Sequence, residues 1–155
     1  MSQFLGTHQN RLDAKGRVSV PAPFRALLKG ADGSASLVLR PSHQHRCIEV
    51  WPVSAFNALS KSLEGLDQFS EEYEDKAASI FADASLIDTD KEGRILLPEF
   101  LVAHAQLTDS VSFLGIGPIF HIWEPAAAAA FKEDARERSR ARSVPSSTPR
   151  AVPVA

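Results

Sequence analysis

Two short apolar stretches of the chain share the same surroundings. Val18-Ser19-Val20 alternates apolar and polar positions, and Ile95-Leu96-Leu97 occupies the matching place further along. Alternation of this kind predicts a half-buried strand. A proline follows each stretch at once, and proline suits the first turn of a helix because its missing N–H would be unpaired there. Each stretch is therefore expected to be the second strand of a strand-turn-strand unit that leads directly into a helix. In the first copy, Phe24, Leu27 and Leu28 of that helix are expected to face the core.

The similarity between the stretches extends to a repeated motif. The first copy reads DAKGRVSVPAPF at residues 13–24, and the second reads DKEGRILLPEFL at residues 90–101. Aspartate, glycine, arginine and proline recur in register. Aspartate hydrogen-bonds its own backbone in turns, and glycine adopts positive φ without penalty. We interpret the chain as two copies of one unit.

Each copy also continues into a tryptophan. Trp51 and Trp123 close short apolar strands, and a helix-prone segment containing a phenylalanine follows each. A large aromatic side chain at the end of an apolar strand is typical of a core anchor, and we favour that over a base-stacking platform.

Periodic apolar residues between the copies predict a helical insert. Phe56, Leu59, Leu63 and Leu66 fall on one face, and a second stripe runs from Tyr73 to Ala84. The expected organisation is a first repeat (1–56), the insert (57–83), a second repeat (84–131) and a charged helix end with a disordered tail (132–155), the disorder beginning at residue 143. The predicted fold class is α+β.

Charge is distributed unevenly over the 155 residues. The formal net charge is −2, yet residues 1–30 carry five cations and one acid, while residues 64–92 carry ten acids and two lysines. Such asymmetry can create a positive face on an acidic protein. The single cysteine, Cys47, excludes a disulfide within the chain. We find no signal-peptide pattern and no run of the roughly 18–20 apolar residues that a membrane span needs, so we expect a cytoplasmic protein.

The sequence gives little support for a metal-binding or catalytic site. His43, His45 and Cys47 offer three metal-ligand types on one loop with no second cluster, whereas structural sites use four ligands. No serine or cysteine nucleophile can be matched to a base. We therefore predict no catalytic residues, no metal, no cofactor and no small-molecule substrate, and we expect that the protein is not an enzyme.

The repeated turn is the feature that suggests a partner. It places Arg17 and Arg94 on tight hairpins, with Lys15 beside the first, and arginine can fork two hydrogen bonds onto a guanine edge or a phosphate. We predict that Arg17 and Lys15 bind DNA, that Arg11 and Asn10 flank them on the adjoining strand, and that Arg94 contributes from the second copy. The alternative is that each arginine only pairs with the aspartate of its own turn.

These residues carry a resemblance to a known family. GT at residues 6–7, NRLDAKGRVSVPAPFR at residues 10–25 and IDTDKEGRILLP at residues 87–98 resemble the two repeats of MraZ proteins, within the broader SpoVT-AbrB group of AbrB-like domains. The resemblance spans about residues 3–131. It implies a swapped-hairpin β-barrel with peripheral helices, a ring-shaped homo-oligomer and a nucleoid-associated transcriptional regulator. Such a regulator binds direct repeats in double-stranded DNA upstream of the division and cell-wall gene cluster, usually as a repressor.

The two copies differ within the turn, and the C-terminal segment carries a second group of cations. Glu92 stands where the first copy has Lys15, so we expect the first turn to dominate DNA contact. The basic run at residues 136–142 is either an auxiliary phosphate-binding arm or a solvated helix end. The rival hypothesis is a non-DNA oligomeric interaction protein or antitoxin-like scaffold, with the acidic insert as its partner surface.

Overall fold

The structure is a computed structural model that describes residues 3–28 and 35–150. It contains two compact units, Met1–Glu124 and Pro125–Ala155. The elements of the first unit are β1 (Thr7–Arg11), β2 (Arg17–Ser19), α1 (Ala22–Leu28), β3 (Ser36–Pro41), β4 (Ile48–Pro52), α2 (Val53–Ser60), the 3₁₀ helix η1 (Lys61–Leu63), α3 (Glu71–Phe81), β5 (Ser85–Asp88), β6 (Arg94–Leu96), α4 (Glu99–His104), β7 (Ser110–Gly115) and β8 (Phe120–Trp123).

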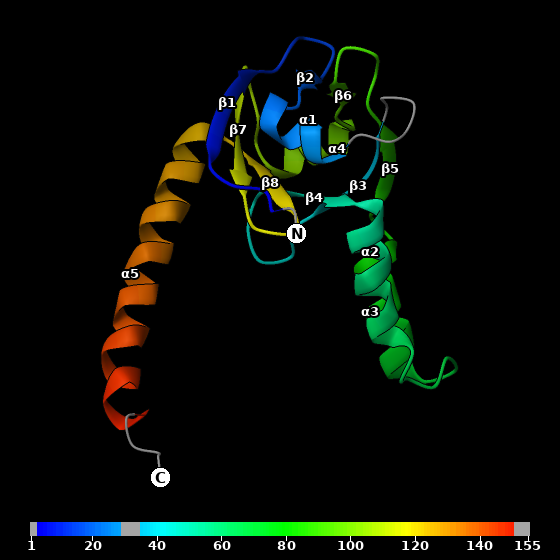
Figure 1. Cartoon of the computed structure of the whole chain (residues 1–155). Helices are drawn as coiled ribbons and strands as arrows, with labels where there is room; N and C mark the ends of the chain where they lie inside the picture. The colour runs from blue at the N-terminus through cyan, green and yellow to red at the C-terminus, as the bar shows by residue number, and fades with distance from the viewer. Residues whose placement is uncertain (1–2, 29–34, 151–155) are drawn as a thin grey trace. The chain divides into compact units, whose positions relative to one another are not determined.

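The two repeats exchange strands. The main sheet has the order β1-β7-β8-β4-β3-β5, and a separate two-stranded ribbon joins β2 to β6 (Figure 1). All pairs are antiparallel. The first strand of each repeat pairs with the other repeat, β1 with β7 and β5 with β3. Swapping the repeats reverses the sheet order and leaves the pairing intact, so the arrangement has pseudo-twofold symmetry.

The expectation of a closed barrel is wrong. The outermost strands of the large sheet, β1 and β5, do not pair with each other in the described part of the chain, and β2 and β6 form their own small sheet. Each ribbon strand is only three residues long. A proline follows two residues after each strand, at Pro21 and Pro98, and proline cannot donate to a ladder hydrogen bond. The ribbon ends there and the helices begin, so the predicted α+β class holds without closure.

An apolar core lies beneath the ribbon. Val18 and Ile95 pair across the ribbon and are each 1% exposed, so both point into the core. Phe24 of α1 is equally buried and packs edge-on against Phe4, with ring centroids 5.2 Å apart. The prediction that Leu27 also faces the core is wrong, because the seven-residue helix buries one face and Leu27 lies on the other.

Aromatic contacts hold the helical insert to the sheet. Trp51 of β4 packs against Phe56 of α2 at 6.2 Å, and Phe56 packs against Phe81 of α3 at 5.8 Å. The buried Arg40 donates a hydrogen bond from Nη2 to the Ser79 carbonyl oxygen at 3.0 Å. Trp51 is half-buried and anchors the insert, whereas the counterpart Trp123 is buried in the core region.

The second unit is one helix, α5 (Pro125–Arg150). Helix therefore extends through residues 143–150, for which the sequence predicts disorder, and residues 151–155 lie outside the described part of the chain. Helix propagation is cooperative once the first turns form, and the alanine-rich start favours it. Within residues 3–28 and 35–150, no helix combines the length and apolarity needed to cross a membrane.

Candidate nucleic-acid interface

The first signature turn (residues 13–17) is closed by the carboxylate of Asp13. Its Oδ1 accepts hydrogen bonds from the backbone N–H groups of Lys15 and Arg17 at 2.9 and 2.8 Å. Its Oδ2 accepts one from Nε of Arg17 at 2.8 Å. Gly16 lies at φ +88°, a left-handed conformation that glycine adopts without penalty. The hydrogen bond from the Arg17 backbone lowers the pKa of Asp13 most, with the Arg17 side chain and Lys15 backbone adding to it.

The second signature turn (residues 90–94) has the same backbone construction. Asp90 accepts from the N–H groups of Glu92 and Arg94 at 2.8 and 2.9 Å, and from Nε of Arg94 at 2.9 Å. Gly93 lies at φ +78°. The pKa of Asp90 is lowered, chiefly by the backbone N–H of Arg94. Each arginine thus pairs with the aspartate of its own turn, as the alternative interpretation of the motif required.

Pairing through Nε does not remove the arginines from the surface. The side chains of Arg17 and Arg94 are 38% and 34% exposed. An arginine that donates only through Nε keeps the donors on its two terminal nitrogens. The aspartates therefore orient the guanidinium groups, and whether the terminal nitrogens remain available depends on the neighbouring side chains.

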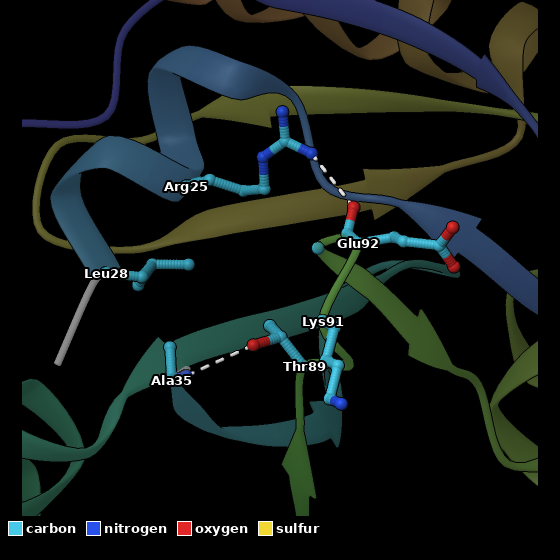
Figure 2. A pocket seen from close by; sticks show the side chains of 7 residues that line it. Arg25, Leu28, Ala35, Thr89, Lys91 and Glu92 are labelled. Atoms are coloured by element: carbon cyan, nitrogen blue, oxygen red, sulfur yellow. Dashed lines mark hydrogen bonds between the residues drawn. The ribbon is translucent and has the colours of Figure 1, made fainter. Parts of the chain in front are cut away.

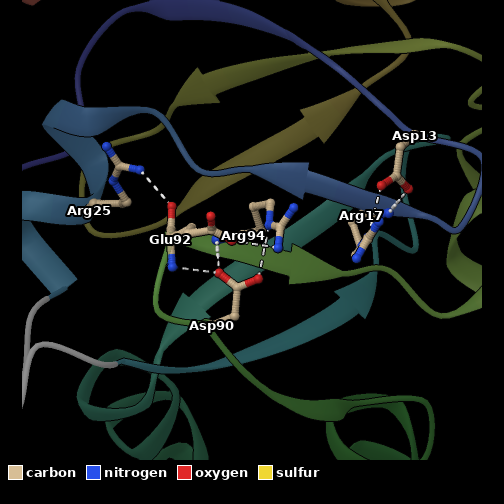
Figure 3. Close-up of polar contacts among 6 residues, drawn as sticks. All are labelled: Asp13, Arg17, Arg25, Asp90, Glu92 and Arg94. Carbon is tan, nitrogen blue, oxygen red and sulfur yellow. Dashed lines mark hydrogen bonds and ion pairs between the residues drawn. The ribbon is translucent and has the colours of Figure 1, made fainter.

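The two turns differ in those neighbours (Figure 3). Nη2 of Arg94 forms an ion pair with Oε1 of Glu92 at 2.7 Å, in addition to the contact with Asp90. Both carboxylates raise the pKa of Arg94, and the hydrogen bond that Arg94 donates to Asp90 contributes most. Among the described residues, Arg17 forms an ion pair with Asp13 alone, and Lys15 stands where the second turn has Glu92.

The ribbon places both arginines on one face. Arg17 is opposite Leu96, and Ser19 is opposite Arg94 in the antiparallel register. Because side chains of a strand alternate between faces, these four lie together on the side opposite the buried Val18–Ile95 pair. Figure 3 shows Arg17 and Arg94 on the neighbouring ribbon strands.

The other predicted residues have separate roles in the fold. Arg11 and Lys15 are exposed, Arg11 on β1 and Lys15 at the tip of the first turn. Asn10 is half-buried, and its Nδ2 donates to the Ser19 carbonyl oxygen at 2.6 Å. Asn10 therefore holds β1 against β2, and this hydrogen bond uses one of the two N–H donors of its amide.

Sequence reasoning missed two residues beside this surface. Ser19 follows Arg17 by two positions in a strand, and that period could have placed it on the same face. Arg25 could not be found in this way. It donates from Nη1 to the Glu92 carbonyl oxygen at 3.2 Å, across 67 residues of chain.

The fold and this surface define a small protein with a duplicated charged turn carried on an exchanged β-ribbon. A sequence model of the family described as "MraZ protein, putative antitoxin-like" matches residues 3–77 and 80–144. The transcriptional regulator MraZ of Gluconacetobacter diazotrophicus is 59% identical over 147 residues, covering 94% of this chain and 93% of that protein. The transcriptional regulator MraZ of Pelagibacter ubique is 40% identical over 136 residues, covering 88% and 87%.

The chain belongs to the MraZ family. This confirms the resemblance found in the two signature segments. The family is one of transcriptional regulators and not of enzymes, and the chain is a transcriptional regulator.

Proposed function

We propose that this regulator binds double-stranded DNA sequence-specifically through the outer face of the β2–β6 ribbon. The observation that carries the proposal is the first turn, where Asp13 orients Arg17 through Nε, no described carboxylate pairs with its terminal nitrogens, and the exposed Lys15 lies two residues earlier in the turn. A two-stranded ribbon fits the major groove of B-DNA, and arginine pairs there with the O6 and N7 atoms of guanine. Arg17 is the base-reading residue in this proposal.

Phosphate contacts come from the flanking cations. Lys15 at the turn and Arg11 on β1 are both exposed, and Arg94 adds a weaker contact because two carboxylates already engage it. The main role of Asn10 in this proposal is to hold β1 against β2, and any contact with DNA is secondary. Phosphate contacts fix the register of a protein on the duplex, while base contacts specify the sequence.

Assembly completes the proposed mode of action. One ribbon offers one strong contact, so discrimination of a promoter requires several copies acting together. A ring-shaped homo-oligomer bound to direct repeats raises the effective concentration of each further ribbon. The proposed target is the promoter of the division and cell-wall gene cluster, which the nucleoid-bound protein represses.

Fluorescence anisotropy with the chain's own upstream DNA tests this function. We expect binding to the upstream duplex, much weaker binding to a scrambled duplex of equal length, and affinity that falls steeply with salt. Light scattering of the same samples reports the oligomer. Equal affinity for both duplexes, or no binding at low salt, would refute the proposal and favour an interaction scaffold instead.

A further inference from the structure

The pseudo-twofold axis relates two surface grooves, one behind each signature turn. The first groove is lined by Leu12, Asp13, Ala14, Lys15, Gly16, Leu97, Glu99, Val102, Ala103, Gln106, Leu107 and Thr108. The second is lined by Arg25, Leu28, Ala35, Thr89, Lys91, Glu92 and Gly93. Five members of the second set have their repeat counterparts in the first set. The grooves are therefore equivalent places in the two repeats.

An arginine occupies the second groove (Figure 2). Arg25 reaches from α1 over the second turn, and its Nη1 donates to the Glu92 carbonyl oxygen at 3.2 Å. Its stem lies against Gly93, since a Cβ built there would collide with Cδ of Arg25 and lie 2.6 Å from Nη1. A guanidinium group with an apolar stem thus fits directly over this type of turn.

The equivalent position over the first turn is open. The counterpart of Arg25 is Val102, which is too short to reach across the turn. Among the described residues, a Cβ on Gly16 would meet the Leu97 carbonyl oxygen at 3.3 Å and Cδ1 of Leu96 at 3.7 Å, so an apolar side chain borders the glycine but no guanidinium group lies over it. The Lys15 carbonyl oxygen, which corresponds to that of Glu92, accepts no hydrogen bond within the described residues. The first groove measures about 650 Å³ and the second about 340 Å³.

Acceptors and apolar side chains line the open groove together. Glu99 forms no ion pair with any described residue. Gln106, also a lining residue, has φ +55°, a left-handed conformation where glycine would be less strained. Val102 and Leu107 supply apolar surface for an aliphatic stem. The planar guanidinium group of arginine matches the geometry of a carboxylate, to which it can donate two parallel hydrogen bonds.

We propose that the first groove binds an arginine side chain presented by a partner polypeptide, in the position that Arg25 occupies over the second turn. The guanidinium group donates to the Lys15 carbonyl oxygen and to the Glu99 carboxylate, and the stem lies over Gly16 and Val102. The groove is unsuited to phosphate because Asp13 and Glu99 both line it. It is therefore a different site from the ribbon surface proposed for DNA, and Lys15 borders both.

Nuclear magnetic resonance titration with Nα-acetylargininamide tests the site. A compound of this size is expected to bind with a Kd of about 1 mM, with shifts centred on Gly16 and Val102. The neutral isostere Nα-acetylcitrullinamide should bind about threefold more weakly or worse. Equal binding of both compounds, or shifts spread over other surfaces, would overturn the proposal.

Two variants of groove residues test whether the probe binds in the first groove. Val102→Arg supplies the missing side chain from the protein itself and should abolish probe binding. Glu99→Gln keeps the fold intact at an exposed position and should weaken binding about threefold. The matched control is Glu71→Gln, another exposed first-turn carboxylate, which should leave binding unchanged. Undiminished binding in both groove variants would overturn the site.

Light scattering of the same variants identifies the source of the arginine. A smaller assembly for Val102→Arg and Glu99→Gln, but not for Glu71→Gln, assigns the arginine to a second copy of the chain. An unchanged assembly together with lost probe binding assigns it to a different polypeptide. Affinity for a duplex that carries a single repeat, measured in parallel, keeps the two proposals apart, because the ribbon surface is unaltered in all three variants and binding to one repeat does not require assembly.

Discussion

The first and second signature turns share a backbone and differ in what surrounds it. In both, one aspartate accepts two backbone hydrogen bonds and one from arginine Nε. In the second turn, the Glu92 carboxylate forms an ion pair with Nη2 of Arg94, and the Arg25 side chain covers Gly93. In the first, neither partner is present. Duplication preserved the conformation of the motif, while a few side chains made one copy available for binding and the other a supported structural element.

The largest expected difference between the turns concerns DNA affinity. Arg17→Ala should weaken binding to the upstream duplex about 10- to 100-fold, because a bidentate arginine–guanine contact contributes about 1–3 kcal/mol. Arg94→Ala should weaken it about threefold or less, since two carboxylates already engage that guanidinium. Anisotropy titrations measure both, with Arg46→Ala as the control at an exposed arginine of the β3–β4 loop. Equal losses at the two turns would show that they act alike.

Replacing the glycine of each turn by alanine should lower the free energy of unfolding by different amounts. Gly16→Ala should cost about 1–2 kcal/mol, because a side chain at positive φ is strained. Gly93→Ala should cost more, since the new Cβ must also displace Arg25. Urea denaturation measures both free energies of unfolding. Gly65, which has no atom within 4 Å of an added Cβ, is the control and should change little.

The larger loss of stability expected for Gly93→Ala is attributed to Arg25, so removing the Arg25 side chain should abolish the difference. In an Arg25→Ala background, Gly93→Ala should cost only what Gly16→Ala costs. If the cost at Gly93 stays high without Arg25, the arginine is not what distinguishes the two turns.

Charge reversal should make the second turn resemble the first. Glu92→Lys removes the ion pair with Arg94 and places a cation where the first turn has Lys15. We expect DNA affinity at low salt to rise about threefold to fivefold, with a steeper salt dependence as further phosphates are contacted. Glu72→Lys makes the same charge change on α3. An equal gain in that control would indicate long-range attraction rather than a contact at the ribbon.

The smallest expected effect is the pH dependence that both turns share. The folded-state pKa values of Asp13 and Asp90 lie below 3.8, so the unfolded chain binds more protons than the folded chain in that interval. Their stabilising contribution is complete above pH 3.8 and is lost as the pH falls through the lowered pKa values. Asp13→Asn and Asp90→Asn should each flatten the acid limb of stability measured by urea denaturation. A steeper limb in either variant would contradict this assignment.

Part of the fold followed directly from local sequence. The aspartate and glycine of each turn act within five residues, so the motif predicts its own hydrogen bonds and its positive φ. Pro21 and Pro98 likewise mark where strands end and helices begin. The prediction of one buried face failed at Leu27, because helical spacing does not reveal how much of a short helix the rest of the fold covers.

By itself, the sequence determined the duplicated turn, the α+β class and the family, since each depends on residues close together in the chain or on their recurrence. Only the tertiary structure decided which strands the repeats pair with each other, that the sheet stays open, and that Arg25 covers the turn of the other repeat. These features depend on contacts between residues far apart in the chain. No local pattern encodes such contacts, because they form only when both repeats pack around one core.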